Sequence, residues 1–226
     1  MKQLFEKVWF KHVALVAVII LVWQLGALGL RNKAKSIGNE ILLPIKHNSC
    51  IQKRGIITWS EIDENQKKKI VNVFNRIENL KEKHKKGFLE FYPYYFASSA
   101  LLLILSSISL VIIFLTLQNG IKEANQYLKT TFFTMAALTS FYSISPLVFK
   151  VEANITSNLN KYIAYDKLQE EIYGYAITQK QLSNPKDEIS FNDFQIYISK
   201  KMIELNSIDT QFDLDAITVR DHKLNN

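Results

Sequence analysis

The chain has 226 residues and a formal net charge of +7, and its apolar residues are gathered in blocks between strongly polar stretches. A pI near 9.3 would suit nucleic-acid binding, but no interleaving of basic and aromatic residues supports it, so we expect no nucleic-acid partner. Cys50 is the only cysteine, which excludes an intramolecular disulfide. The composition therefore favours a small integral membrane protein over a soluble domain.

The first apolar run covers 13–30 and follows a short basic N-terminal tail over 1–12. Ala27-Leu28-Gly29 resembles a signal-peptide cleavage site. However, the run is longer than the roughly 7–15 residues of a signal-peptide core. Basic residues over 31–35 also flank it as they flank membrane spans. We therefore predict that 13–30 is a transmembrane helix that is retained.

A basic polar segment follows over 31–93. Pro44, Gly55 and the absence of a sustained period predict a loop over 41–58. An amphipathic helix is predicted over about 60–86, because Ser60 can cap it and apolar residues then recur at spacings of three and four. The residues that we expect to face a partner helix are Ile70, Val73, Ile77 and Leu80.

Four lysines near the end of this helix precede the next apolar run; they are Lys81, Lys83, Lys85 and Lys86. Aromatic residues over 88–95 follow them, as in the interfacial belts of membrane proteins. The lysines suit a topology signal. They also suit a contact with anionic lipid, since each basic residue near a charged membrane surface adds about 1 kcal/mol. Both interpretations place them at a membrane surface.

Two further apolar runs, over 94–117 and 130–149, contain no Asp, Glu, Lys, Arg or His. A bilayer core of roughly 30 Å takes about 20 residues of helix, and both runs meet this length. The turn over 118–129 is too short to hold a domain, so we predict a transmembrane hairpin. Small and hydroxyl residues along it predict a seam between its helices, a contact between protomers or, in a ring of protomers, a pore lining. These residues are Ser99, Ser106, Ala136, Ser140 and Ser143.

The third span is expected to continue without a break into an amphipathic helix over 150–183. Its apolar residues recur at spacings of three and four, so it is the expected partner of the helix over 60–86. The residues that we expect to make this contact are Ile155, Leu159 and Tyr162.

The end of the chain is more polar. Asn184-Pro185 is expected to break the preceding helix, because a residue before proline avoids helical geometry. Ser190 can cap a last helix over 190–206. The polar tail over 207–226 is expected to be mobile.

The hairpin places 31–93 and 150–226 on one side of the membrane and the N-terminus on the other. Lys and Arg near the spans are more numerous on the side with the large segments, and the positive-inside rule then makes this side cytoplasmic. The opposite orientation stays open, because the basic N-terminus also resembles a signal anchor that remains inside. We expect a multi-pass protein of the cell (inner) membrane with its large segments cytoplasmic.

The predicted fold is an all-α membrane protein with three transmembrane helices, in which the C-terminal hairpin extends into an amphipathic juxtamembrane bundle or coiled coil. The four histidines lie far apart, and no HExxH, GxSxG or glycine-rich phosphate loop surrounds them. The spans also lack the ionisable groups of a proton- or ion-coupled transporter. We therefore expect no enzymatic activity, catalytic residue, cofactor, metal or small-molecule substrate.

Paired spans flanked by amphipathic helices resemble the small two-span effector domains of bacterial defence systems called SLATT domains. The resemblance covers the hairpin and the helix over 162–175. It rests on architecture rather than on a motif, and the N-terminal span lies outside it.

Three functional hypotheses follow. The first is a structural or interaction subunit of a membrane complex, because amphipathic helices next to the spans need partners, either a second copy of the chain or another membrane protein. The second is an oligomeric pore or membrane-disrupting effector built on the hairpin. The third is a sensor whose large segments lie outside the cell and bind a ligand in their helical bundle; it fails if these segments are cytoplasmic. In each case the lipid bilayer is itself a contact.

Overall fold

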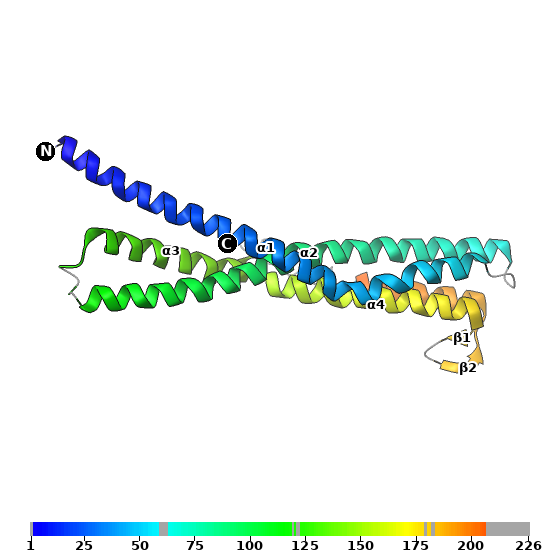
Figure 1. The fold of residues 1–226 in the computed structure, drawn as a ribbon. Helices are drawn as coiled ribbons and strands as arrows, with labels where there is room; N and C mark the ends of the chain where they lie inside the picture. Colours follow the sequence, from blue (N-terminus) through cyan, green and yellow to red (C-terminus); the bar gives the residue numbers. More distant parts are fainter. Residues whose placement is uncertain are drawn as a thin grey trace, which may run out of the picture. The chain divides into compact units, whose positions relative to one another are not determined.

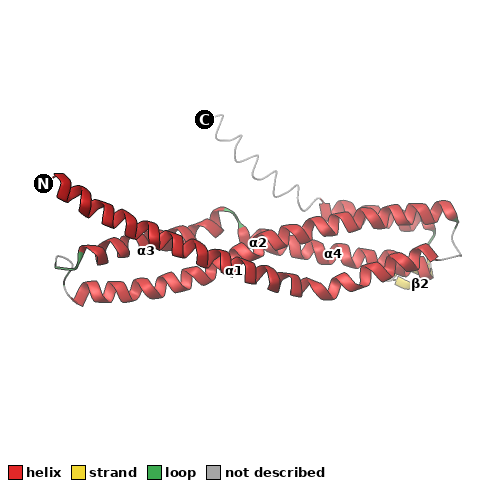
Figure 2. Cartoon of the chain, turned by 45° about the horizontal axis from the view of Figure 1, so that its top comes forward, coloured by secondary structure: helices red, strands yellow, loops and turns green. Residues whose placement is uncertain are grey.

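The computed structural model describes residues 2–58, 63–118, 120, 123–178, 180–181 and 184–206. Its elements are α1 (Lys2–Thr58), α2 (Glu64–Gln118), α3 (Gln126–Val148), α4 (Val151–Thr178), β1 (Lys180–Gln181), β2 (Asn184–Glu188) and a helix over 191–206. The fold is helical, as predicted, with one short antiparallel strand pair that was not predicted (Figures 1 and 2). Among the described residues, α1, α2 and α3 each contain a segment long and apolar enough to cross a membrane.

α1 is a single helix of 57 residues that contains the predicted span over 13–30. The loop predicted over 41–58 is wrong, because the backbone stays helical to Thr58. The absence of an apolar period means only that a helix has no single buried face. It does not show that the helix ends there. Pro44 removes one backbone hydrogen bond, but α1 continues past it and past Gly55.

α2 is also one helix, of 55 residues, although the sequence predicts separate elements over about 60–86 and 94–117. Pro93 lies inside α2 and is buried. A proline within a helix removes one backbone hydrogen bond, but apolar helices tolerate this loss where other helices pack around them. The predicted cap Ser60 lies outside the described residues.

The connection between α2 and α3 falls within the turn predicted over 118–129. α3 begins after Asn125, whose side chain accepts a hydrogen bond of 2.9 Å from the backbone N–H of Tyr127. This cap satisfies one of the amides that the first turn of a helix leaves unpaired. α3 therefore begins at Gln126, before the predicted start of the span at Thr130.

α3 and α4 are separated by a turn of two residues, Phe149 and Lys150, where the sequence predicts one continuous helix. Lys150 has a φ of 46°, in the left-handed region that commonly ends helices. The N–H groups of Phe149 and Lys150 donate to the carbonyls of Ser145 and Leu147, each at 3.1 Å. Pro146 has no N–H to donate, so the hydrogen-bond ladder of α3 is already weakened where the helix stops.

α4 ends at Thr178, before the predicted end at 183. α4 has therefore ended before Asn184-Pro185, the residues predicted to break it, and these residues begin β2, which pairs with β1. The predicted cap is confirmed: the hydroxyl of Ser190 accepts a hydrogen bond of 3.2 Å from the backbone N–H of Asp193. The tail predicted to be mobile, 207–226, lies outside the described residues.

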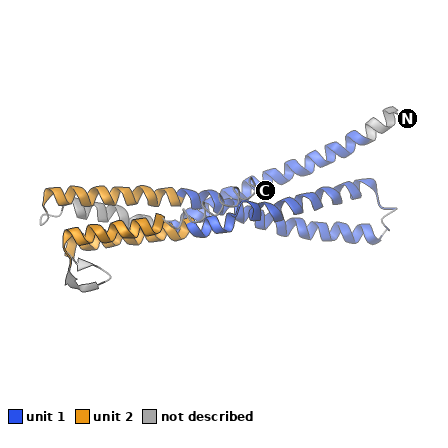
Figure 3. Cartoon of the chain, turned by 180° about the vertical axis from the view of Figure 1, so that it is seen from behind, with its two compact units in different colours: residues 1–42, 86–157 blue, residues 43–85, 158–226 orange. Residues whose placement is uncertain are grey.

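The chain divides into two compact units (Figure 3). Unit 1 comprises residues 1–42 and 86–157, and unit 2 comprises residues 43–85 and 158–226. The core of unit 1 is apolar and draws on α1, α2 and α3. Its buried residues are Ala27, Leu101, Leu105, Ile112, Met135 and Tyr142.

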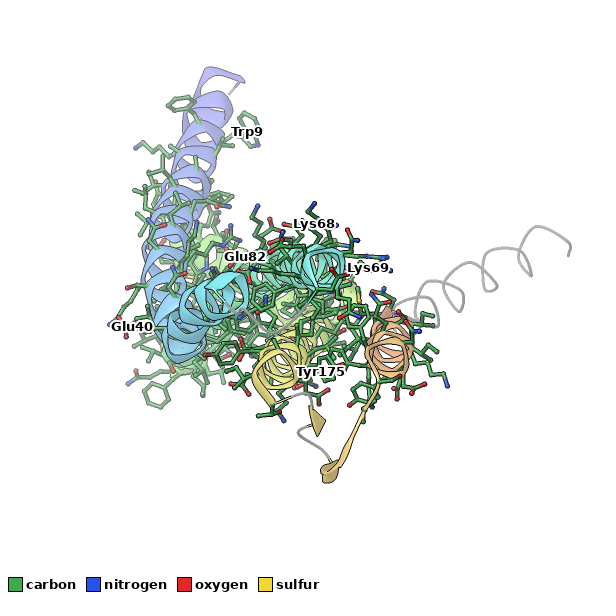
Figure 4. All side chains as sticks on the ribbon, turned by 90° about the vertical axis from the view of Figure 1, so that its right-hand side faces the viewer. Trp9, Glu40, Lys68, Lys69, Glu82 and Tyr175 are labelled. Atoms are coloured by element: carbon green, nitrogen blue, oxygen red, sulfur yellow. The ribbon has the colours of Figure 1, made fainter. Side chains whose placement is uncertain are left out.

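The core of unit 2 is formed by α2, α4 and the helix over 191–206, seen end-on in Figure 4. Its buried residues are Ile70, Phe74, Ile77, Tyr165, Leu168, Ile172, Tyr175, Ala176, Phe194, Ile198 and Met202. Tyr175 of α4 stacks on Phe194, with ring centroids 3.8 Å apart. Lys68 and Lys69 of α2 are exposed, and Lys68 lies on the side of α2 turned away from α4 (Figure 4).

Candidate functional site

A network of polar side chains is buried between α2 and α4 in unit 2. Lys81 of α2 is only 2% exposed, and its ammonium pairs with the carboxylate of Asp166 on α4. The ammonium also donates a hydrogen bond of 3.1 Å to Oε1 of Gln169. The amide nitrogen of Gln169 in turn donates to the carboxylate of Glu78 on α2. The network therefore joins the two helices at fixed positions.

Helical spacing explains why these side chains meet. Glu78 and Lys81 are three residues apart on α2, while Tyr162, Asp166 and Gln169 recur every three or four residues on α4. Side chains at these intervals share one face of a helix. Polar side chains of α2 that face α4 are thus matched by polar side chains of α4.

Tyr162 completes the network and is 1% exposed. The ammonium of Lys81 lies 5.5 Å from the centroid of its ring, within the range of a cation–π contact. Burial, followed by the nearby carboxylates of Asp166, Glu82 and Glu78, raises the pKa of the Tyr162 phenol to about 12. The phenol therefore stays protonated at neutral pH and cannot act there as a base. We expect the network to fix which helix faces meet rather than to perform chemistry.

A second polar contact lies farther along α2, at His84, which is 6% exposed. Its Nδ1 lies 2.9 Å from Oδ1 of Asn158 and donates to it, because an amide oxygen can only accept. The imidazole stacks on Tyr165, with ring centroids 5.6 Å apart. The hydroxyl of Tyr165 donates to Oδ1 of Asn206 at 2.9 Å, so the contact reaches the helix over 191–206.

A pocket of about 170 Å³ opens beside the core of unit 2. Its walls are mostly apolar, and Gln195 and Ser199 supply its polar groups. The apolar lining residues are Ile70, Val73, Ile172, Phe194 and Ile198. An engineered apolar cavity of about 150 Å³ binds benzene, so this pocket is large enough for one small apolar molecule.

The lysines predicted to contact anionic lipid do not act as one cluster. The prediction is wrong for Lys81, because its ammonium is buried and paired within unit 2. Lys85 is half-buried and pairs with Glu82 at 3.0 Å, one helical turn away. Lys83 and Lys86 are exposed, and for these two a lipid contact stays a prediction.

The residues predicted to face a partner helix fall mainly in the core of unit 2. Those of α2 are in this core or pack against it, namely Ile70, Val73, Ile77 and Leu80. On α4, Tyr162 is buried in the polar network and Leu159 is half-buried. Ile155 is half-buried but belongs to unit 1. The contacts of α4 with the core come instead from residues farther along the helix, such as Leu168 and Ile172.

The residues predicted to form a seam in the hairpin are largely at the surface of unit 1. Ser99 and Ala136 are half-buried, and the other three are exposed: Ser106, Ser140 and Ser143. Ser106 and Ser140 each donate a hydrogen bond to a carbonyl of their own helix, at 2.8 and 3.0 Å. Within one chain, larger residues such as Leu105 and Met135 fill the core instead. A contact between protomers or a pore lining stays a prediction.

Sequence reasoning misses the buried network because it assigns charged residues to the surface. Lys81 follows Ile77 by four residues and therefore continues the apolar stripe of Ile70, Val73 and Ile77. A charged residue at a core position of such a stripe is the signal that identifies this site.

Within the part of the chain that the structure describes, no group of three or more His, Cys, Asp or Glu side chains could hold a metal ion. A comparison with known protein families, curated proteins and solved structures finds no match for this chain. The function is therefore inferred from the geometry of the two units.

Proposed function

We propose that the protein is an interaction subunit anchored in a membrane, with unit 1 as its membrane part and unit 2 as its docking part. The distribution of exposed apolar side chains is the observation that carries this proposal. Among the described residues, all large hydrophobic residues that are exposed lie in unit 1 except Leu43, Ile177, Ile196 and Ile203. Soluble surfaces rarely carry apolar patches of that extent, whereas surfaces in contact with lipid require them.

Unit 2 has the opposite character. Its apolar residues are mostly buried in a core of their own, and Lys81, Tyr162 and Gln169 of the polar network are almost fully buried. An ion pair that has lost its water is strongly dependent on correct geometry, so the helices of unit 2 are held in one arrangement. A bundle with one arrangement presents a constant surface to a partner.

The helix over 191–206 offers the surface for that partner. Phe194, Ile198 and Met202 face the core of unit 2, while Ile196 and Ile203 are 53% and 67% exposed. Ile196 and Ile203 are seven residues apart, so they lie on one outward stripe of the helix. Neither Ile196 nor Ile203 is buried by the fold of the single chain. We propose that they contact a second copy of the chain or another membrane protein.

Crosslinking tests this docking surface. A photo-crosslinking amino acid at position 203, in the full chain in its native membrane, is expected to give one discrete product of higher mass. Mass spectrometry of this product then distinguishes a second copy from a different protein. The matched control is position 204, because Glu204 is exposed and points about 100° around the helix. Equal products at both positions, or none, would contradict the proposed surface.

The orientation of the membrane part is also a proposal, with the large segments cytoplasmic. Labelling of Cys50, the only cysteine, with a membrane-impermeant maleimide is expected only after cells are permeabilised. A denatured sample shows whether burial limits the reaction. Labelling in intact cells would reverse the orientation and place the large segments outside.

The pocket in unit 2 favours a second candidate function, a sensor that binds a small apolar molecule. Its volume and mostly apolar lining suit such a ligand. The pore hypothesis gains no comparable support from unit 1. The hydroxyls of Ser106 and Ser140 bond to their own helix, and a serine bonded in this way suits a lipid-facing position as well as a watery one.

A further inference from the structure

Arg31 lies on the face of α1 that packs into unit 1. Ala27 and Ala34, four residues before it and three after it, are 3% and 0% exposed. Gly38 follows on the same face, where an added Cβ would lie 3.2 Å from the side chains of Leu89 and Tyr92 of α2. The small residues Ala27, Ala34 and Gly38 let α1 approach its neighbours closely. Arg31 is a long cationic side chain on the same face. Arg31 itself is half-buried. Charged side chains that are buried usually have a partner.

Among the residues that the structure describes, Arg31 has an aromatic contact but no carboxylate partner. Its guanidinium carbon lies 5.1 Å from the centroid of the Tyr94 ring. Its Nε is buried without a hydrogen-bond acceptor. No Asp or Glu lies within ion-pair distance of Arg31 among the residues that the structure describes. A contact with a ring face leaves the N–H donors of a guanidinium unused.

Hydroxyl groups from α2 and α3 gather beside this cation. Tyr94 shares a hydrogen bond of 2.6 Å with Ser145 of α3. Tyr142, one turn before Ser145 on α3, is also buried. Ser98, one turn after Tyr94 on α2, is 1% exposed, and its hydroxyl has no partner among the described residues. In the described part of α1, α2 and α3, the cluster thus has a cation and several hydroxyl groups but no anion.

We propose that this cluster binds a phosphate oxyanion, and that the phosphate belongs to an anionic lipid headgroup. The N–H donors of a guanidinium can bind two oxygens of one phosphate. In many proteins a carboxylate binds to these donors instead. The position supports a lipid source, since Arg31 directly follows the apolar run over 13–30, Tyr94 begins the run over 94–117 and Ser145 lies near the end of α3. Basic sites between helices at the edge of a bilayer are where lipid headgroups bind. The inference rests on the membrane placement of unit 1 proposed above.

Lipid retention tests the site. The full chain is reconstituted in nanodiscs of phosphatidylcholine with a minor fraction of phosphatidylglycerol, and the lipids that stay bound are measured by native mass spectrometry. Wild-type protein is expected to retain phosphatidylglycerol preferentially. Arg31→Gln is expected to reduce this preference about tenfold or more, as expected for the loss of a charged hydrogen bond. Arg31→Lys keeps the charge without the fork, so its preference should be intermediate.

Lys33→Gln is the matched control, because Lys33 is exposed on the same helix and carries the same charge. A loss as large in Lys33→Gln as in Arg31→Gln would mean that general charge, not this site, selects the lipid. Unchanged retention in Arg31→Gln would also overturn the inference. Flotation with phosphatidylcholine liposomes is measured first for every variant. Failure of the wild type to float would contradict the membrane placement itself, and the inference with it.

A second arm distinguishes the source of the phosphate. In detergent without phospholipid, millimolar inorganic phosphate is expected to leave the melting temperature of the wild type unchanged relative to chloride at equal ionic strength. The opposite result would be a phosphate-dependent rise in the melting temperature of the wild type that Arg31→Gln lacks, together with no selective lipid retention by the wild type. That result would assign the site to soluble phosphate and overturn the lipid source.

Discussion

Replacing Lys81 with methionine is expected to lower the free energy of unfolding by about 3 kcal/mol, because Asp166 and Gln169 then lose their buried cation. Breaking a buried ion pair costs about 3–5 kcal/mol. We expect the low end of this range, because the side chain of Asp166 is still 15% exposed to solvent. Methionine resembles the apolar stem of lysine, so the loss reports the charge rather than a cavity. Thermal melts of the full chain in detergent, followed by circular dichroism, measure the effect.

Lys83→Met is the control for Lys81→Met, because Lys83 is exposed two residues farther along α2. Its melting temperature should match that of the wild type, as surface changes usually stay within about 0.5 kcal/mol. Combining Lys81→Met with Asp166→Leu removes both charges and should recover much of the lost stability. If Lys81→Met alone melts like the wild type, the buried pair does not hold α2 and α4 together.

Replacing Ile77 with aspartate is expected to have a still larger effect, more than about 4 kcal/mol. Ile77 is fully buried in the core of unit 2, so the change removes apolar burial and adds a carboxylate that has no partner. A loss of that size approaches the whole stability of many domains. The variant should therefore fail to accumulate as a single species when the detergent-solubilised protein is analysed by size-exclusion chromatography.

Asn79→Asp introduces the same charge two residues farther along, at an exposed position, and should behave like the wild type. Leu159→Asp should give a smaller loss than Ile77→Asp, because Leu159 is only half-buried. A monodisperse Ile77→Asp protein with wild-type melting would show that the contact between α2 and α4 in unit 2 is wrong.

The spans could be predicted from the sequence because length and hydrophobicity are local properties of an apolar run. The helix ends could not, and three prolines show why. α1 continues through Pro44 and α2 through Pro93, whereas α3 ends two residues after Pro146. A proline costs a helix one hydrogen bond in each case, and the surrounding chain decides whether the helix survives. Local sequence treats all three prolines alike.

The candidate sites divide in the same way. Spacing along α2 correctly indicated that Ile70 and Ile77 are core residues, because periodicity identifies a buried face without naming its partner. It could not indicate that Lys81 meets Asp166, 85 residues later in the chain. Arg31 was interpreted as a flank of the first span, since its position in the stripe of Ala27 and Ala34 is evident only when α1 is seen to continue beyond it.

The separation of Lys81 from Asp166 has a consequence for biosynthesis. The chain is made from its N-terminus, so Lys81 leaves the ribosome 85 residues before its partner and, at that stage, is one of four lysines that precede an apolar run. Orientation in the membrane is set by the Lys and Arg residues present while the spans insert. Under the membrane placement proposed above, the same side chain would guide insertion first and leave the aqueous phase later, when α4 has been synthesised.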